Sequence, residues 1–193
     1  MTTANKITVL RILLVPLFAY AILSYRESGH EWQRWLALVA FGLAAVLDGV
    51  DGFIARRFHQ KSELGAILDP TADKLLLATG VVLLSFEHAH LNRLPLWLIL
   101  VIISRDAFLL LGLMIVHITC GKCDVRPRWT GKVATVLQMS CVLWALLKLN
   151  VQIQTYVAAA AASLTLISGL QYFYDGVRQL SASPRSGPTP GQK

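Results

Sequence analysis

Six long apolar runs alternate with short polar segments along the chain. Each approaches the roughly 20 residues that an α-helix needs to cross about 30 Å of hydrocarbon. The runs cover about residues 7–24, 35–53, 65–86, 94–118, 131–147 and 151–173. This pattern predicts an all-α polytopic membrane protein with about six transmembrane helices.

The two ends of the chain differ from this pattern in opposite ways. The first run resembles the apolar part of a secretory signal, but Arg11 interrupts it and no small-residue cleavage site follows at Ser24. We therefore expect an uncleaved helix. Residues 181–193 are rich in Pro, Gly and Ser and show no apolar periodicity. We expect one transmembrane domain over residues 1–180, followed by a disordered tail over residues 181–193.

Composition supports the membrane interpretation and gives an orientation. Of the 193 residues 55% are apolar and 15% charged, against roughly 25% charged in soluble domains. The net charge of +7 raises the possibility of nucleic-acid binding, but the basic residues cluster in the gaps between apolar runs, as in proteins oriented in a bilayer. Eleven Lys and Arg lie on the side of both termini and four on the other. We expect no nucleic-acid partner, and both termini in the cytoplasm or on the equivalent face of an organelle membrane.

The three cysteines suggest no disulfide framework. Cys120 and Cys123 form a single CxxC sequence, and Cys141 stands alone. One such pair is a weak indication of zinc binding or redox chemistry. We interpret it as a loop turn with reduced thiols.

Four aspartates fall within or at the ends of the second and third apolar runs, and they are the first candidates for a functional site. A charge at membrane depth costs at least about 2.5–3.5 kcal/mol and needs a partner. On a helix, residues 48 and 51 lie about 60° apart and residues 69 and 73 about 40° apart, so each pair shares a face. The sequence therefore predicts a cluster of four carboxylates: Asp48, Asp51, Asp69 and Asp73.

Four carboxylates in a low-dielectric site repel one another unless cations lie among them. Hard divalent ions suit such ligands, Mg²⁺ first and Mn²⁺ or Ca²⁺ next. Gly52 and Gly65 allow close approach to the backbone, and Arg56 supplies planar donors to phosphate oxygens. Arg57 is better explained as positive-inside charge. A cation pathway in a transporter or channel is the alternative from another class, although Arg56 beside the carboxylates argues against it.

These residues together resemble a known family. Asp48-Gly-Val-Asp-Gly-Phe-Ile-Ala-Arg56, eight further residues and Gly65-Ala-Ile-Leu-Asp-Pro-Thr-Ala-Asp73 match all eight fixed positions, over 26 residues, of the CDP-alcohol phosphatidyltransferase motif. The similarity extends to residues 7–11, to Ser104-Arg105-Asp106 and to Gly131-Lys132, and leaves out only the tail. It implies a six-helix membrane enzyme, usually a homodimer, with a polar active-site cavity that faces the cytoplasm.

The resemblance also implies a role for each residue of the motif. The four aspartates would hold two divalent ions, and Asp73 would also take the proton from the acceptor hydroxyl as the catalytic residue. The hydroxyl would attack the β-phosphorus of CDP-diacylglycerol, and CMP would leave. The residues that would bind the CDP group are Asp48, Gly52, Ala55, Arg56 and Gly65.

The acceptor alcohol is the open question. The chain is most similar to the phosphatidylglycerophosphate synthases, which use glycerol 3-phosphate, and to the eukaryotic-type cardiolipin synthases, which use phosphatidylglycerol. Ser104-Arg105-Asp106 follows the cardiolipin synthases, and Ala134 stands where the other group commonly has a second lysine. A phosphodiester carries less charge than a phosphomonoester, so we prefer phosphatidylglycerol, with glycerol 3-phosphate as the alternative. The candidate acceptor-binding residues are Arg105, Lys132, Arg126 and Arg128, of which the last two suit positive-inside charge equally well.

Overall fold

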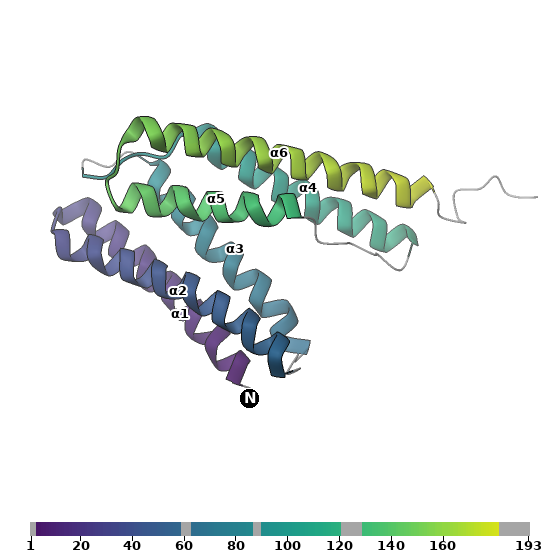
Figure 1. Cartoon of the computed structure of the whole chain (residues 1–193), viewed down its shortest axis with the longest axis horizontal. Coiled ribbons are helices and arrows are strands. Elements are labelled where there is room, and N and C mark those ends of the chain that lie inside the picture. The colour runs from purple at the N-terminus through teal and green to yellow at the C-terminus, as the bar shows by residue number, and fades with distance from the viewer. Residues whose placement is uncertain (1–2, 59–62, 87–89, 121–128, 182–193) are drawn as a thin grey trace, which may run out of the picture. The chain divides into compact units, whose positions relative to one another are not determined.

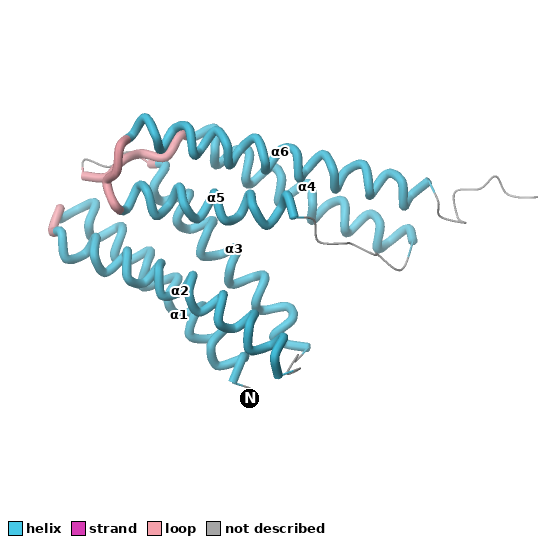
Figure 2. The backbone as a smooth tube through the Cα atoms, in the orientation of Figure 1, coloured by secondary structure: helices cyan, strands magenta, loops and turns pink. Residues whose placement is uncertain are grey.

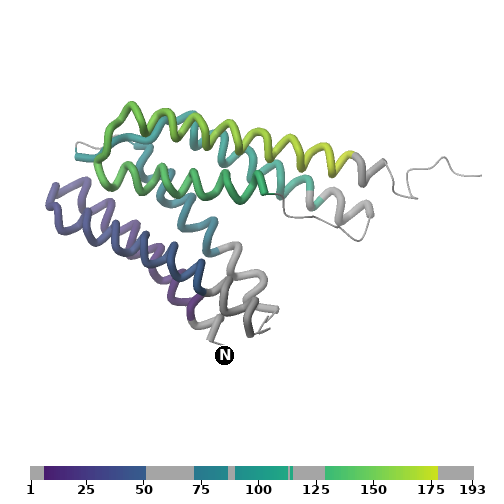
Figure 3. Tube along the Cα trace, viewed as in Figure 1, coloured from purple at the N-terminus to yellow at the C-terminus, as the bar shows by residue number. Residues whose placement is uncertain are grey.

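The computed structural model describes residues 3–58, 63–86, 90–120 and 129–181, and side chains for 7–50, 72–86, 90–112, 114 and 129–177 (coloured in Figure 3). In this part of the chain all regular structure is helical (Figure 2). Each predicted apolar run falls on a helix, so the all-α prediction is confirmed. The helices are α1 (Thr3–Ser28), α2 (Glu31–Phe58), α3 (Glu63–Ser85), α4 (Leu96–Cys120), α5 (Trp129–Leu146) and α6 (Val151–Ser181).

Three helices in the searched part of the chain are long and apolar enough to cross a membrane. They contain the spans Ile7–Ser28, Glu31–Val50 and Val151–Val177. Their outward faces carry large apolar side chains such as Leu13, Val39 and Val46, each about three-fifths exposed. Such faces suit lipid better than water. The structure is that of an all-α membrane protein, while six spans and a polar cavity stay predictions. The predicted disordered tail begins at Ser181, which is the last residue of α6, and residues 182–193 lie outside the described residues.

The chain folds into two compact units, each with its own interior. The first contains residues 1–95 and 138–157, and the second contains residues 96–137 and 158–193. In the first unit α1 packs against α2 and α3, and the rings of Phe18 and Phe41 lie 5.4 Å apart. In the second unit the buried residues of α5 and α6 are small, including Ala134, Ala161 and Ser168. Small residues let helices approach closely in a membrane.

A two-residue turn joins α1 to α2, and its geometry favours glycine. Gly29 has φ +68°, and its N–H donates to the carbonyl of Tyr25 at 2.9 Å. A Cβ at this position would meet His90 Nε2 at 2.9 Å, so a side chain would be strained by the backbone conformation and would require His90 to move. The turn sends α2 back alongside α1, as Figure 1 shows.

The connection from α5 to α6 also turns sharply, but without glycine. The N–H of Leu149 donates to Trp144 O at 3.3 Å, and the N–H of Lys148 donates to Ala145 O at 3.1 Å. These two bonds form a Schellman motif, in which the left-handed position is usually glycine. Here Lys148 occupies that position with φ 54°. A lysine in this conformation costs about 1–2 kcal/mol of backbone energy relative to glycine.

Candidate active site

The predicted aspartates lie on two helices of the first unit. Asp48 and Asp51 belong to α2, and Asp69 and Asp73 belong to α3. Helix α1 contacts both of these helices. Side chains are described for Asp48 and Asp73, whereas six predicted site residues lie outside the described side chains: Asp51, Gly52, Ala55, Arg56, Gly65 and Asp69.

Asp48 forms an ion pair with an arginine that the sequence did not assign to the site. Arg11 on α1 donates from Nη1 to Oδ1 of Asp48. The Arg11 side chain is 1% exposed and that of Asp48 is 42% exposed. The sequence did contain a signal for this pair: Arg11 interrupts an apolar run, and a charge at membrane depth needs a partner. The sequence alone did not say which acid it would meet.

Asp73 has a buried carboxylate oxygen to which none of the described residues donates a hydrogen bond. No donor among the described residues reaches its Oδ1, although Asp73 interacts electrostatically with Asp48 and Arg11. A buried carboxylate oxygen without a donor is costly unless a proton or cation binds it. The donor set of carboxylate oxygens suits a hard divalent cation. The two described aspartates therefore fit the predicted metal site.

Arg105, a predicted acceptor-binding residue, lies in the polar interior of the second unit. Its Nη1 donates to Oδ1 of Asp106 at 2.7 Å, and its Nη2 lies 3.4 Å from the hydroxyl of Ser168 on α6. Its Nε is buried without a hydrogen-bond partner in the described part of the chain. The Arg105 side chain is 15% exposed, and its Nε–H is a donor that no described residue uses.

Two glycines lie beside the Arg105 side chain. A Cβ on Gly131 of α5 would lie 3.2 Å from Arg105 Nη2 and 3.2 Å from the Ser168 hydroxyl. A Cβ on Gly169 of α6 would lie 3.4 Å from Arg105 Cγ. The 3.2 Å distances at Gly131 are tight, whereas 3.4 Å at Gly169 is ordinary van der Waals contact, so Gly131 is the glycine whose missing side chain leaves room for Arg105. The match between Gly131 and Arg105 was not predicted.

The other acceptor candidates have different surroundings. Lys132 is exposed, and its ammonium lies 5.4 Å from the centre of the Trp129 ring. Arg126 and Arg128 lie outside the described residues. Ala134, which stands where related sequences commonly have a second lysine, is 1% exposed. Arg105 and Lys132 both belong to the second unit, and Arg105 is the buried one of the two.

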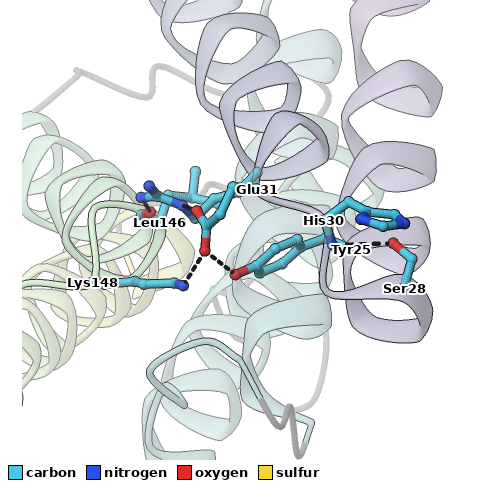
Figure 4. A network of polar contacts seen from close by, with 7 residues as sticks. Tyr25, Ser28, His30, Glu31, Leu146 and Lys148 are labelled. Carbon is cyan, nitrogen blue, oxygen red and sulfur yellow. Dashed lines mark hydrogen bonds and ion pairs between the residues drawn. The ribbon is translucent and has the colours of Figure 1, made fainter.

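A second polar network lies at the α1–α2 turn and was not predicted (Figure 4). Glu31 accepts from the Tyr25 hydroxyl at 2.9 Å, from Arg34 Nε at 2.6 Å and from Lys148 Nζ at 2.7 Å. Arg34 also donates to the carbonyl of Leu146 at 2.9 Å. The hydrogen bond with Glu31 raises the pKa of Lys148. This network joins α1, α2 and the α5–α6 connection, and its carboxylate is fully paired.

The cysteines add no site among the described residues. Cys120 is the last residue of α4, and Cys123 lies outside the described residues. Cys141 is free and buried. The interpretation of the CxxC sequence as a loop turn stays a prediction.

The family model of CDP-alcohol phosphatidyltransferases matches residues 1–167. The chain belongs to this family, and the predicted enzyme class is confirmed. It is similar to a Mycobacterium tuberculosis H37Rv protein named "Probable phosphatidylglycerophosphate synthase", 32% identical over 92% of this chain and 82% of the relative. It is also similar to the CDP-diacylglycerol–glycerol-3-phosphate 3-phosphatidyltransferases of Shigella flexneri serotype 5b and Escherichia coli K12. Each is 37% identical over 86% of this chain and 90% of the relative.

These relatives bear on the choice of acceptor. The Shigella flexneri and Escherichia coli relatives are named for their reaction, and both names contain glycerol 3-phosphate as the acceptor. They support the alternative acceptor better than the preferred phosphatidylglycerol.

Proposed function

We propose that this protein transfers a phosphatidyl group from CDP-diacylglycerol to glycerol 3-phosphate and releases CMP. The observation that carries the proposal is the 37% identity, over 86% of the chain, with enzymes named for this reaction. The buried Nε–H of Arg105, for which no described residue is an acceptor, supports a phosphate-bearing acceptor. The relatives outweigh the substitutions that favoured phosphatidylglycerol.

In the proposed reaction, one P–O bond forms and one breaks. The hydroxyl oxygen of glycerol 3-phosphate attacks the β-phosphorus of CDP-diacylglycerol, and the bond from that phosphorus to the bridging oxygen breaks. CMP leaves with the bonding electrons. Asp73 receives the hydroxyl proton as general base. Its Oδ1, which has no donor among the described residues, is an atom suited to accept a proton or a cation.

The four aspartates are proposed to hold two divalent cations, Mg²⁺ in the first place. Bound there, the cations would neutralise the phosphate oxygens and stabilise the charge that develops on the leaving group. Asp48 and Asp73 belong to different helices that α1 contacts. Asp51 and Asp69 complete the proposed set: each lies one helical turn from the described aspartate on its own helix.

The CDP group is proposed to bind beside these aspartates. Gly52 and Gly65 would allow its phosphates close to the backbone, and Arg56 would donate to phosphate oxygens. Ala55 and Asp48 complete the proposed set. Both termini and the site are proposed to face the cytoplasm, as the distribution of Lys and Arg predicts, and the protein is proposed to be a homodimer.

The acceptor phosphate is proposed to bind Arg105, with Lys132 as a second cation and Arg126 and Arg128 as further candidates. A phosphomonoester carries about −1.5 to −2 charges near neutral pH, and guanidinium groups bind it through paired hydrogen bonds. Phosphatidylglycerol is the second candidate acceptor. The observation that favours it is Ala134, a buried position without the second lysine.

The test is CMP release by the purified protein with CDP-diacylglycerol and Mg²⁺, with each acceptor in a separate reaction. We expect release with glycerol 3-phosphate, a product that retains the phosphomonoester, and loss of activity with a chelator. Release with phosphatidylglycerol alone would make the protein a cardiolipin synthase. No release with either acceptor, together with cation flux through protein-containing vesicles, would favour the cation pathway.

A further inference from the structure

Arg11 is the one charged residue that is fully buried in the described part of the chain. It lies on the inward face of α1, which also carries the buried residues Thr8, Leu14 and Phe18 at helical spacing. It also falls within the candidate membrane span Ile7–Ser28. Burial of an arginine there is costly unless it is well paired, so the position requires a specific anion.

The anion that Arg11 meets is the first aspartate of the motif. Arg11 donates from Nη1 to Oδ1 of Asp48, across the contact between α1 and α2. A hydrogen bond to one carboxylate oxygen limits rotation of the carboxylate plane, and a carboxylate has a second oxygen that can ligate a cation. Helix α1 also packs against α3, so Arg11 lies on the helix that contacts both aspartate-bearing helices.

This arrangement resembles the support that metal ligands commonly receive. Carboxylate ligands are themselves hydrogen-bonded, and loss of such a partner typically weakens metal affinity 10- to 100-fold. The planar guanidinium is suited to orient a carboxylate, whereas an ammonium group acts more as a point charge. Arg11 thus combines a buried position with a planar group that donates to Asp48.

We infer that Arg11 is a positioning residue that holds the carboxylate of Asp48 in the orientation required for divalent-cation binding. The inference rests on the proposed metal-dependent transfer reaction and adds a residue on α1 to its site. In this role Arg11 acts through Asp48, the carboxylate to which it donates.

Positioning and simple electrostatics make opposite predictions for loss of this arginine. Arg11 carries a positive charge beside the proposed cations, so its removal reduces repulsion and would by itself tighten cation binding. Removal also leaves Asp48 free to rotate, which weakens binding if orientation matters. The sign of the change in cation affinity therefore decides between the two roles.

The experiment measures Mn²⁺ binding to the purified protein without CDP-diacylglycerol, by the electron paramagnetic resonance signal of free Mn²⁺. The variants are Arg11→Met and Arg11→Lys. Arg34→Met is the matched control, because Arg34 is a mostly buried arginine of the same unit that pairs with Glu31 and Leu146. Thermal unfolding of each variant is measured alongside.

We expect Arg11→Met to weaken Mn²⁺ binding about 10- to 100-fold, Arg11→Lys to weaken it less, and Arg34→Met to leave it unchanged. Unchanged or tighter binding by Arg11→Met would overturn the inference. If Arg11→Met does not fold, Arg11→Lys is used instead, and unchanged or tighter Mn²⁺ binding by that variant would overturn the inference. Wild-type protein that binds no Mn²⁺ would also overturn it.

The proposed function is tested separately by CMP release at saturating Mn²⁺. Wild-type protein that binds Mn²⁺ but releases no CMP would reject the transfer reaction, and the Arg11 result would stand. CMP release by wild type, with unchanged affinity in Arg11→Met, would reject only the positioning role.

Discussion

The α1–α2 hairpin carries an arginine–carboxylate pair near each end, and the two pairs differ in how completely the acid is bound. At the turn, Glu31 accepts hydrogen bonds from three side chains, those of Tyr25, Arg34 and Lys148. Toward the other end, Asp48 is bound by Arg11, and the nearby Asp73 has a buried oxygen without a donor among the described residues. Among the described residues, Glu31 joins α1, α2 and the α5–α6 connection, whereas the unmet oxygen of Asp73 is suited to a proton or a cation.

The same contrast separates two arginines, one in each unit. Arg34 of the first unit uses Nε and Nη1 to bind Glu31 and the carbonyl of Leu146. Arg105 of the second unit keeps a buried Nε without a partner in the described part of the chain. Because an unpaired buried donor is costly, Arg105 is the better candidate for a substrate phosphate.

The largest effect on activity is expected when the carboxylate of Asp73 is changed, and Glu31 provides the comparison. Asp73→Asn removes the proposed base and a cation ligand, so we expect CMP release to fall about 10²- to 10⁴-fold with the fold intact. Glu31→Gln is the matched change at the turn. It should leave the rate unchanged and lower the thermal unfolding midpoint, because three donors lose a charged acceptor. CMP release and thermal unfolding in detergent micelles measure both, and full activity of Asp73→Asn would break the comparison.

A smaller effect is expected where Gly131 contacts Arg105. In Gly131→Ala the added Cβ would lie 3.2 Å from Arg105 Nη2, so the guanidinium must shift. A hydrogen bond to a charged group contributes about 1.5–3 kcal/mol, and we expect the KM for glycerol 3-phosphate to rise about tenfold or more with the KM for CDP-diacylglycerol unchanged. Gly112→Ala on α4 is the control, since its Cβ meets nothing within 4 Å. If Gly131→Ala and Gly112→Ala have the same KM for glycerol 3-phosphate, Arg105 is not part of the acceptor site.

The smallest effect is expected at Lys148, where side-chain pairing and backbone conformation oppose each other. Lys148→Ala and Lys148→Gly both lose the ammonium that binds Glu31, but only glycine accepts φ 54° without strain. We expect the glycine variant to be more stable than the alanine variant by about 1 kcal/mol, with the same CMP release. Denaturant unfolding measures the difference. Equal stabilities would show that the turn relaxes and that the lysine is not held under strain.

The sequence by itself determined the helices, the membrane environment and the candidate chemistry. Apolar runs of membrane-spanning length and the spacing of the four aspartates are local properties, and the motif from Asp48 to Asp73 lies on two successive helices joined by a short connection. These features can therefore be predicted without tertiary contacts, as can the need of Arg11 for a partner.

Only the tertiary structure decided which distant groups meet. The pairs Arg11–Asp48 and Lys148–Glu31 are separated by 37 and 117 residues, and no periodicity encodes such separations. The space that Gly131 leaves for the Arg105 side chain depends on how closely α4, α5 and α6 approach one another. Whether a polar group is satisfied is a property of its neighbours in space, and that property distinguishes Asp73 from Glu31.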